Sequence, residues 1–67
     1  MRVIINKAPE HDWQKMVADN LKLRNEVDLE SFIYPDDLEI CHTLANQNKA
    51  KVYLNADKTI CWFTFSN

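Results

Sequence analysis

The chain has 67 residues, 46% of them hydrophobic and 10% aromatic, with a formal net charge of −2. This length allows one domain, residues 1–67, and this composition excludes an intrinsically disordered segment. Glycine is absent, which excludes a phosphate-binding P-loop, a dinucleotide-binding turn and a nucleophile elbow, because their backbones need φ > 0 or a close approach to the ligand. The turns must then use Asn and Asp, as in residues 55–57.

Two cysteines, Cys41 and Cys61, are too few for a disulfide framework, and their apolar contexts are typical of buried, reduced thiols. The sequence opens without a charged and then apolar leader, and no apolar run approaches the roughly 18 residues of a membrane span. We therefore expect a cytoplasmic protein that neither spans nor binds a membrane. Met1 leads us to expect a complete small open reading frame.

The first third of the chain predicts a strand and then a helix. Residues 2–6 (RVIIN) are rich in β-branched side chains, as in a strand. Pro9 suits the first turn of the helix, and Glu10 and Asp12 suit the positive end of its dipole. At about 100° per residue, the apolar side of this helix collects Trp13, Met16, Val17, Leu21 and Leu23. The predicted helix is therefore amphipathic.

The segment 25–34 is ambiguous. Val27 and Leu29 alternate with charged residues, as in a half-buried strand. Leu29, Phe32 and Ile33 also match the spacing of a helical turn capped by Asp28. Because Pro35 disfavours helical geometry at the residue before it, we favour an extended segment.

The remaining chain predicts a helix and a β-hairpin. The helix spans residues 35–46, with Pro35 and two acids in its first turn, and the hairpin joins residues 50–54 to 59–65. The order β-α-(β)-α-β-β indicates an α+β fold, a small two-layer sandwich. We expect a mainly antiparallel sheet, both helices packed on one face, and the first strand beside the C-terminal hairpin.

The last predicted strand is apolar on both sides. Ile60, Trp62 and Thr64 point one way, and Cys61, Phe63 and Phe65 point the other. A strand in a two-layer domain should have one polar side, so this pattern predicts a cover on each face of the sheet. So short a chain has few elements to spare, which makes a second subunit or a partner protein a candidate for the second cover.

The charges are segregated along the chain. Every Lys and Arg lies outside residues 25–48, while that window holds six of the ten acids, namely Glu26, Asp28, Glu30, Asp36, Asp37 and Glu39. Such a block predicts a negative field that steers the protein to a basic partner, and the alternative is a solvated surface that keeps the protein soluble. Nucleic acid is a rival ligand, because Lys49, Lys51 and Tyr53 gather at one strand. The pI near 5.5 argues against it.

No residues predict an enzyme, a cofactor or a metal site. Cys41 and His42 are adjacent on a helix and point about 100° apart, so they do not form a dyad. A zinc site from His11, Cys41, His42 and Cys61 has suitable ligand types but lacks a closely spaced pair.

The sequence therefore predicts a non-enzymatic interaction protein that binds, and inhibits or regulates, a larger partner with a basic surface, such as one that handles nucleic acid. The six acids 26, 28, 30, 36, 37 and 39 steer the encounter, and Phe32, Tyr34 and Trp62 are the predicted apolar anchors. Size and charge are those of phage or mobile-element host-takeover and anti-defence proteins. The alternatives are an obligate homodimer that buries the aromatic C-terminal strand, and a cysteine-dependent or zinc-binding protein.

Overall fold

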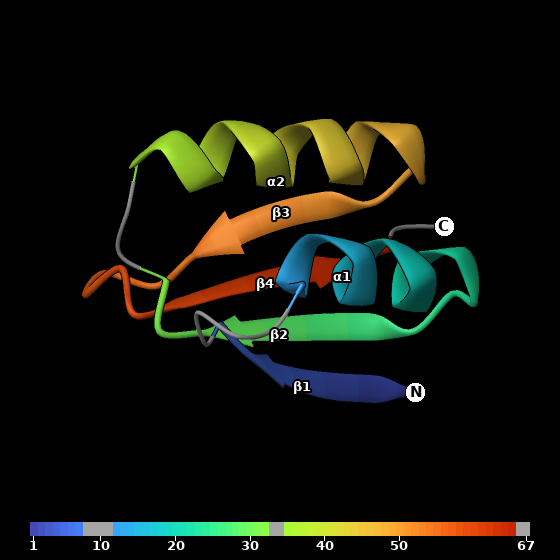
Figure 1. Cartoon of the computed structure of the whole chain (residues 1–67), viewed down its shortest axis with the longest axis horizontal. Helices are drawn as coiled ribbons and strands as arrows, with labels where there is room; N and C mark the ends of the chain where they lie inside the picture. The colour runs from blue at the N-terminus through green and yellow to red at the C-terminus, as the bar shows by residue number, and fades with distance from the viewer. Residues whose placement is uncertain (8–11, 33–34, 66–67) are drawn as a thin grey trace.

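The computed structural model describes residues 1–7, 12–32 and 35–65. Six elements follow one another (Figure 1): β1 (Arg2–Asn6), α1 (Trp13–Lys22), β2 (Glu26–Glu30), α2 (Pro35–Gln47), β3 (Lys51–Leu54) and β4 (Ile60–Thr64). The predicted α+β class and the order of elements are confirmed, and the ambiguous central segment contains a strand.

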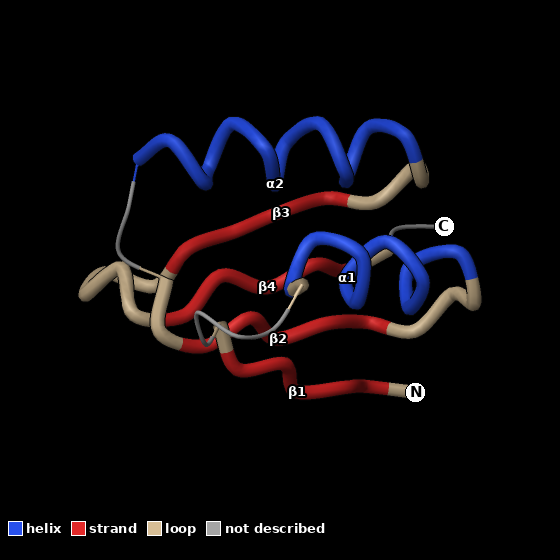
Figure 2. Tube along the Cα trace, viewed as in Figure 1, coloured by secondary structure: helices blue, strands red, loops and turns tan. Residues whose placement is uncertain are grey.

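The four strands form one mixed sheet in the order β1-β2-β4-β3 (Figure 2). β1 and β2 are parallel, whereas β2–β4 and β3–β4 are antiparallel. The sheet is therefore mainly antiparallel, as predicted, but the expected place of the first strand beside the hairpin is wrong. A parallel pair needs a long crossover, and the segment through α1 provides one between β1 and β2, which puts β2 between β1 and the hairpin.

One core lies between the sheet and both helices. Its buried side chains are Ile5, Trp13, Val17, Leu21, Val27, Leu29, Phe32, Cys41, Ala45, Cys61 and Phe63. The strand residues in this core all share one face of the sheet in the observed register, so α1 and α2 cover the same face, as predicted. The opposite face of the sheet has no covering layer within the described part of the chain (Figure 1).

The helix α1 ends at Lys22, before a residue that the sequence places on its apolar side. It begins at Trp13, and the side chain of Asp12 caps it by accepting a hydrogen bond from the backbone N–H of Lys15 at 3.2 Å. The predicted start at Pro9 lies outside the described residues. Leu23, expected on the apolar side, is the C-terminal cap and is 73% exposed. The apolar side therefore consists of Trp13, Val17 and Leu21.

Turns are built without glycine, and not in the way the sequence predicts. Among the described residues, the left-handed backbone positions are held by Arg24, Ser31, Lys49 and Lys58, not by Asn or Asp. Asn55 instead stabilises the hairpin through its side chain, whose Oδ1 accepts from the N–H groups of Thr59 and Ile60.

Both helices end in the same motif with a basic residue at the left-handed position. After α2, the N–H of Ala50 donates to the carbonyl of Ala45 at 2.8 Å, and Lys49 has φ 58°. After α1, the N–H of Asn25 donates to the carbonyl of Asn20 at 2.9 Å, and Arg24 has φ 64°. This is the Schellman arrangement, in which glycine usually occupies the left-handed position because it has no Cβ.

Replacing Lys49 with glycine is therefore expected to stabilise the protein. The substitution relieves a backbone cost of about 1–2 kcal/mol and loosens the unfolded chain, so we expect a net gain of roughly 0.5–1 kcal/mol. The free energy of unfolding in urea measures it. Lys51→Gly is the matched control, because Lys51 lies in β3. Glycine in a strand should lower the stability of the protein by about as much as Lys49→Gly raises it. Destabilisation by both changes would contradict this account of the turn.

Candidate binding surface on the open face of the sheet

The uncovered face of the sheet carries three rows of side chains. The strand register places Arg2, Glu26, Thr64 and Lys51 in the first row, Ile4, Asp28, Trp62 and Tyr53 in the second, and Asn6, Glu30 and Ile60 in the third. None of these residues is buried. Ile4 is 64% exposed and Tyr53 is 46% exposed. We call this surface the open face.

Two aromatic rings stack at one side of the open face. Tyr53 of β3 and Trp62 of β4 lie directly opposite each other, with ring centroids 5.7 Å apart and ring planes at 24°. Cross-strand aromatic pairs stabilise a sheet, and this one also presents a broad apolar surface to its surroundings. The prediction that Trp62 points away from Phe63 is confirmed, since Phe63 lies in the core.

Three carboxylates along β2, those of Glu26, Asp28 and Glu30, lie beside the aromatic pair. Asp28 accepts two hydrogen bonds from Arg2, at 3.0 Å from Nε and 2.8 Å from Nη2. The bonds to Asp28, followed by its charge, raise the pKa of Arg2 above its ordinary value. Glu26 accepts from the hydroxyl of Thr64 at 2.8 Å. Within the described residues, the Glu30 carboxylate has no hydrogen-bond or ion-pair partner.

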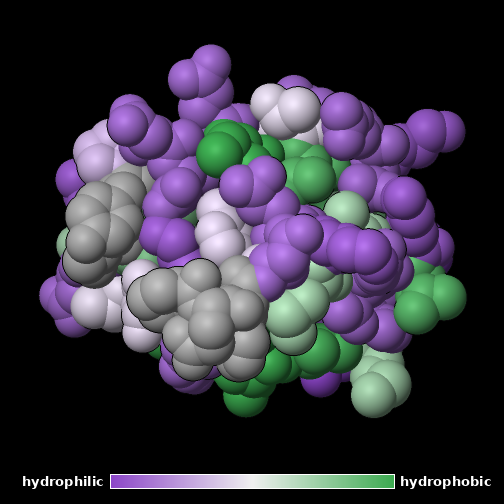
Figure 3. Space-filling view, viewed as in Figure 1, coloured by the Kyte–Doolittle hydropathy of each residue, from purple (hydrophilic) through white to green (hydrophobic). Residues whose placement is uncertain are grey.

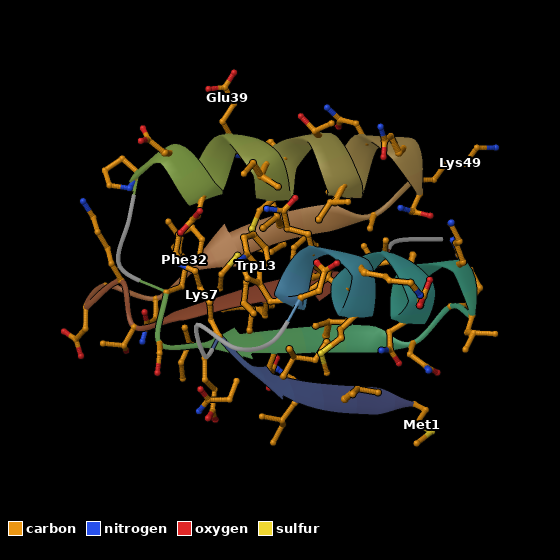
Figure 4. The ribbon with its side chains drawn as sticks, in the orientation of Figure 1. Met1, Lys7, Trp13, Phe32, Glu39 and Lys49 are labelled. Atoms are coloured by element: carbon orange, nitrogen blue, oxygen red, sulfur yellow. The ribbon has the colours of Figure 1, made fainter. Side chains whose placement is uncertain are left out.

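The sheet separates the acidic residues that the sequence groups together. Glu26, Asp28 and Glu30 lie on the open face, whereas Asp36 and Glu39 line a shallow groove between α1 and α2. Figure 4 shows Glu39 pointing from α2 away from the sheet. The helix-bearing side seen in Figure 3 is mainly hydrophilic. A single acidic face that spans residues 26–39 is therefore not formed.

Two other predicted site residues, Phe32 and Asp37, do not lie on the open face. Phe32 is 2% exposed and belongs to the core, so it cannot anchor a partner. Ser31, at φ 64°, ends the strand alternation, and the N–H of Phe32 donates to the carbonyl of Thr59, which directs the ring inward. Asp37 forms an ion pair with Lys7 of the β1 end, and its side chain is 19% exposed. Tyr34 lies outside the described residues.

Sequence reasoning missed Ile4 and the position of Tyr53 beside Trp62. One signal for Ile4 was present, because Ile4 and Ile5 are consecutive and must point to opposite faces of a strand. The pairing of Tyr53 with Trp62 depends on the hairpin register, which the loop between the strands decides.

The two cysteines lie together in the core, where neither is exposed and both are free thiols. The hydrogen bond between them, followed by burial, raises the pKa of Cys41 well above its ordinary value. A nucleophilic cysteine needs the opposite shift, because the thiolate is the reactive form. His42 is exposed, His11 lies outside the described residues, and no three His, Cys, Asp or Glu side chains among those described converge as metal ligands would.

The buried thiol predicts a loss of stability at alkaline pH. The folded-state pKa of Cys41 lies above the unfolded value of about 9, so above about pH 9 the unfolded chain releases a proton that the folded protein keeps. The contribution of this thiol to the free energy of unfolding is therefore fully present below this pH. Above it, the free energy of unfolding falls by about 1.4 kcal/mol per pH unit. Urea unfolding between about pH 8 and about pH 10, with reductant present, measures the slope.

Cys41→Ala is the comparison for this experiment. The tyrosines and lysines also titrate in this range, but their contributions are common to both proteins. We expect the free energy of unfolding of the variant to fall less steeply with pH, by the slope that corresponds to one proton. Equal slopes would contradict the protonated, buried thiol, as would rapid alkylation of the native protein near neutral pH.

Comparison of the chain with protein-family models, curated proteins and solved structures finds no match. Of the helices in the described part of the chain, neither is long and apolar enough to cross a bilayer.

Proposed function

We propose that the protein is a non-enzymatic binding protein that docks onto a larger protein with a basic surface through the open face, and so inhibits or regulates it. The stacked pair of an exposed Tyr53 and a half-buried Trp62, beside the carboxylates of β2, is the observation that carries this proposal. Aromatic side chains supply most of the affinity of protein interfaces, and complementary charge guides the encounter. The helix-bearing side is mainly hydrophilic where Figure 3 draws the described residues.

The composition of the open face favours a protein over nucleic acid. Three carboxylates, Glu26, Asp28 and Glu30, lie on it with only two cations, Arg2 and Lys51. Affinity for nucleic acid depends mainly on neutralising phosphates, and these carboxylates would repel them. The reduced pair Cys41 and Cys61 supports a cytoplasmic location as part of the proposal, because thiols stay reduced there.

The size of the open face favours a larger partner over a second copy of the chain. Four strands spaced by about 4.8 Å, each with about five residues at 3.3 Å, give a footprint of roughly 320 Å². A stable interface buries about 800 Å² on each partner. Two flat copies would share only this footprint, whereas a concave partner can also contact the flanks of the sheet. Sedimentation equilibrium should therefore give the monomer mass of 7.9 kDa.

Two matched double variants test the proposal. Glu30→Lys/Trp62→Ser changes the open face, and Glu39→Lys/Met16→Ser makes the same change of charge and polarity on the exposed side of the helices. Both are checked for folding by circular dichroism. Proteins captured from lysate at about 0.15 M salt are identified by mass spectrometry, purified, and titrated with all three forms of the protein.

We expect a purified partner to bind the native protein and the helix-side variant equally, and the open-face variant at least tenfold more weakly. Equal binding by the open-face variant would show that this surface is not the docking site. A dimer in sedimentation, with loss of dimerisation in the open-face variant, would favour the homodimer in its place.

A further inference from the structure

The open face already holds one guanidinium group, that of its own Arg2. Asp28 receives two hydrogen bonds from Arg2, although the Arg2 side chain is 60% exposed and is therefore held by little else. Two parallel N–H donors directed at one carboxylate are the geometry in which a planar guanidinium is recognised. The carboxylate of Asp28 is thus oriented on the open face in a way that suits arginine.

The same chain also stacks cations on aromatic rings. The guanidinium of Arg24 lies 3.9 Å from the ring centroid of Phe65, and Nζ of Lys7 lies 5.8 Å from that of Trp13. On the open face, no described cation lies over Trp62, the best type of ring for such a contact. Trp62 stands in its row between Asp28 and Tyr53.

We propose that the open face binds an arginine side chain of the partner, with its guanidinium stacked on Trp62 and donating to the carboxylate of Glu30. Glu30 lies on β2 two residues from Asp28, which pairs with Trp62. Diagonal neighbours of this kind have Cβ atoms roughly 7 Å apart, a gap that a guanidinium can bridge. The proposal rests on the proposed function and names the anchor by which a basic partner is recognised.

Arginine fits this site better than the other candidate ligands. A lysine ammonium can approach the ring or the carboxylate but has no planar fork that serves both. A nucleobase could stack on Trp62 and Tyr53, but its phosphates would lie close to three carboxylates.

The test is a titration of the ¹⁵N-labelled protein with short capped peptides. The probe is a Gly-Arg-Gly peptide amide, and matched peptides replace arginine with lysine or with citrulline, which has the same shape without the charge. A thymidine oligonucleotide tests the nucleic-acid alternative. The indole N–H signals of Trp62 and Trp13 report separately, and Trp13, at 8% exposed, serves as an internal reference.

We expect the arginine peptide to shift the Trp62 indole signal saturably, with a Kd on the order of 1 mM, and to leave the Trp13 signal in place. The lysine peptide should bind at least threefold more weakly, and the citrulline peptide should not bind measurably. Trp62→Leu, which lacks the indole reporter and is followed by its backbone amide signals, should weaken binding about tenfold, and Glu30→Gln about fivefold. Glu39→Gln, on α2, is the matched control and should leave the affinity unchanged.

The inference is overturned if citrulline binds as well as arginine, if the oligonucleotide binds more tightly than the arginine peptide, or if no signal shifts up to about 10 mM peptide. Its failure can be distinguished from that of the proposed function. If Glu30→Lys/Trp62→Ser loses binding to the purified partner but the native protein does not bind the arginine peptide, the open face remains the docking surface and the arginine anchor is wrong. If the native protein binds the arginine peptide but that variant binds the partner normally, the arginine site is supported and the open face is not the docking surface for that partner.

Discussion

Phe63→Ala is expected to unfold most of the protein, whereas alanine at the adjacent Trp62 is expected to leave it folded. Phe63 is 1% exposed and lies in the core. Truncating a buried phenylalanine costs about 3–5 kcal/mol, and a domain of this size has roughly 3–10 kcal/mol of total stability. Circular dichroism and urea unfolding should therefore show a largely unfolded or barely stable Phe63→Ala protein.

Trp62 occupies the other side of the same strand and should behave differently. Its substitution removes the stack with Tyr53 and some half-buried apolar surface, for a cost of about 1 kcal/mol. The variant should fold and lose partner binding. If Trp62→Ala destabilises as much as Phe63→Ala, and the melting temperature of the native protein rises with concentration, the open face is covered by another copy in solution.

Lys7→Ala is expected to be the most destabilising substitution of a charged residue. Lys7 follows β1, forms an ion pair with Asp37 of α2, and lies 5.8 Å from the ring centroids of Trp13 and Phe32 (Figure 4). The charged side chains are only 14% and 19% exposed. Loss of Lys7 leaves Asp37 without this partner, at a cost of about 2–3 kcal/mol, less than for a fully buried pair.

A double-mutant cycle separates the ion pair from the packing of the lysine stem. Asp37→Leu and Lys7→Met each leave one charged side chain without its partner in this ion pair. The combined variant removes both charges. We expect the combined change to cost less than the sum of the single changes by at least about 1 kcal/mol. Strict additivity in urea unfolding would show that Lys7 does not stabilise the protein through this ion pair.

Local patterns predicted the elements of this fold well. The alternation in the last strand separates Trp62 from Phe63, and the predicted C-terminal hairpin is found. Pro35 correctly favoured an extended segment before α2, where β2 is found. These features depend on residues close in sequence, so the sequence contains the information that decides them.

Features that depend on distant residues were not predictable in the same way. The position of β2 between β1 and the hairpin comes from pairing over the whole chain. The acids at 26–30 and 36–39 adjoin in sequence, yet one set lies on the sheet and the other on a helix of the opposite layer. Phe32 entered the core because Ser31 changes the direction of the chain, which no alternation pattern shows.

The most direct test of the account is a map of backbone amide shifts on the ¹⁵N-labelled protein when the purified partner is added. The account predicts that the shifts concentrate on the open face, at Ile4, Asp28, Tyr53 and Trp62. Shifts confined to the groove between the helices, at Gln14, Thr43 and Gln47, would contradict it and move the binding surface to the other side of the molecule.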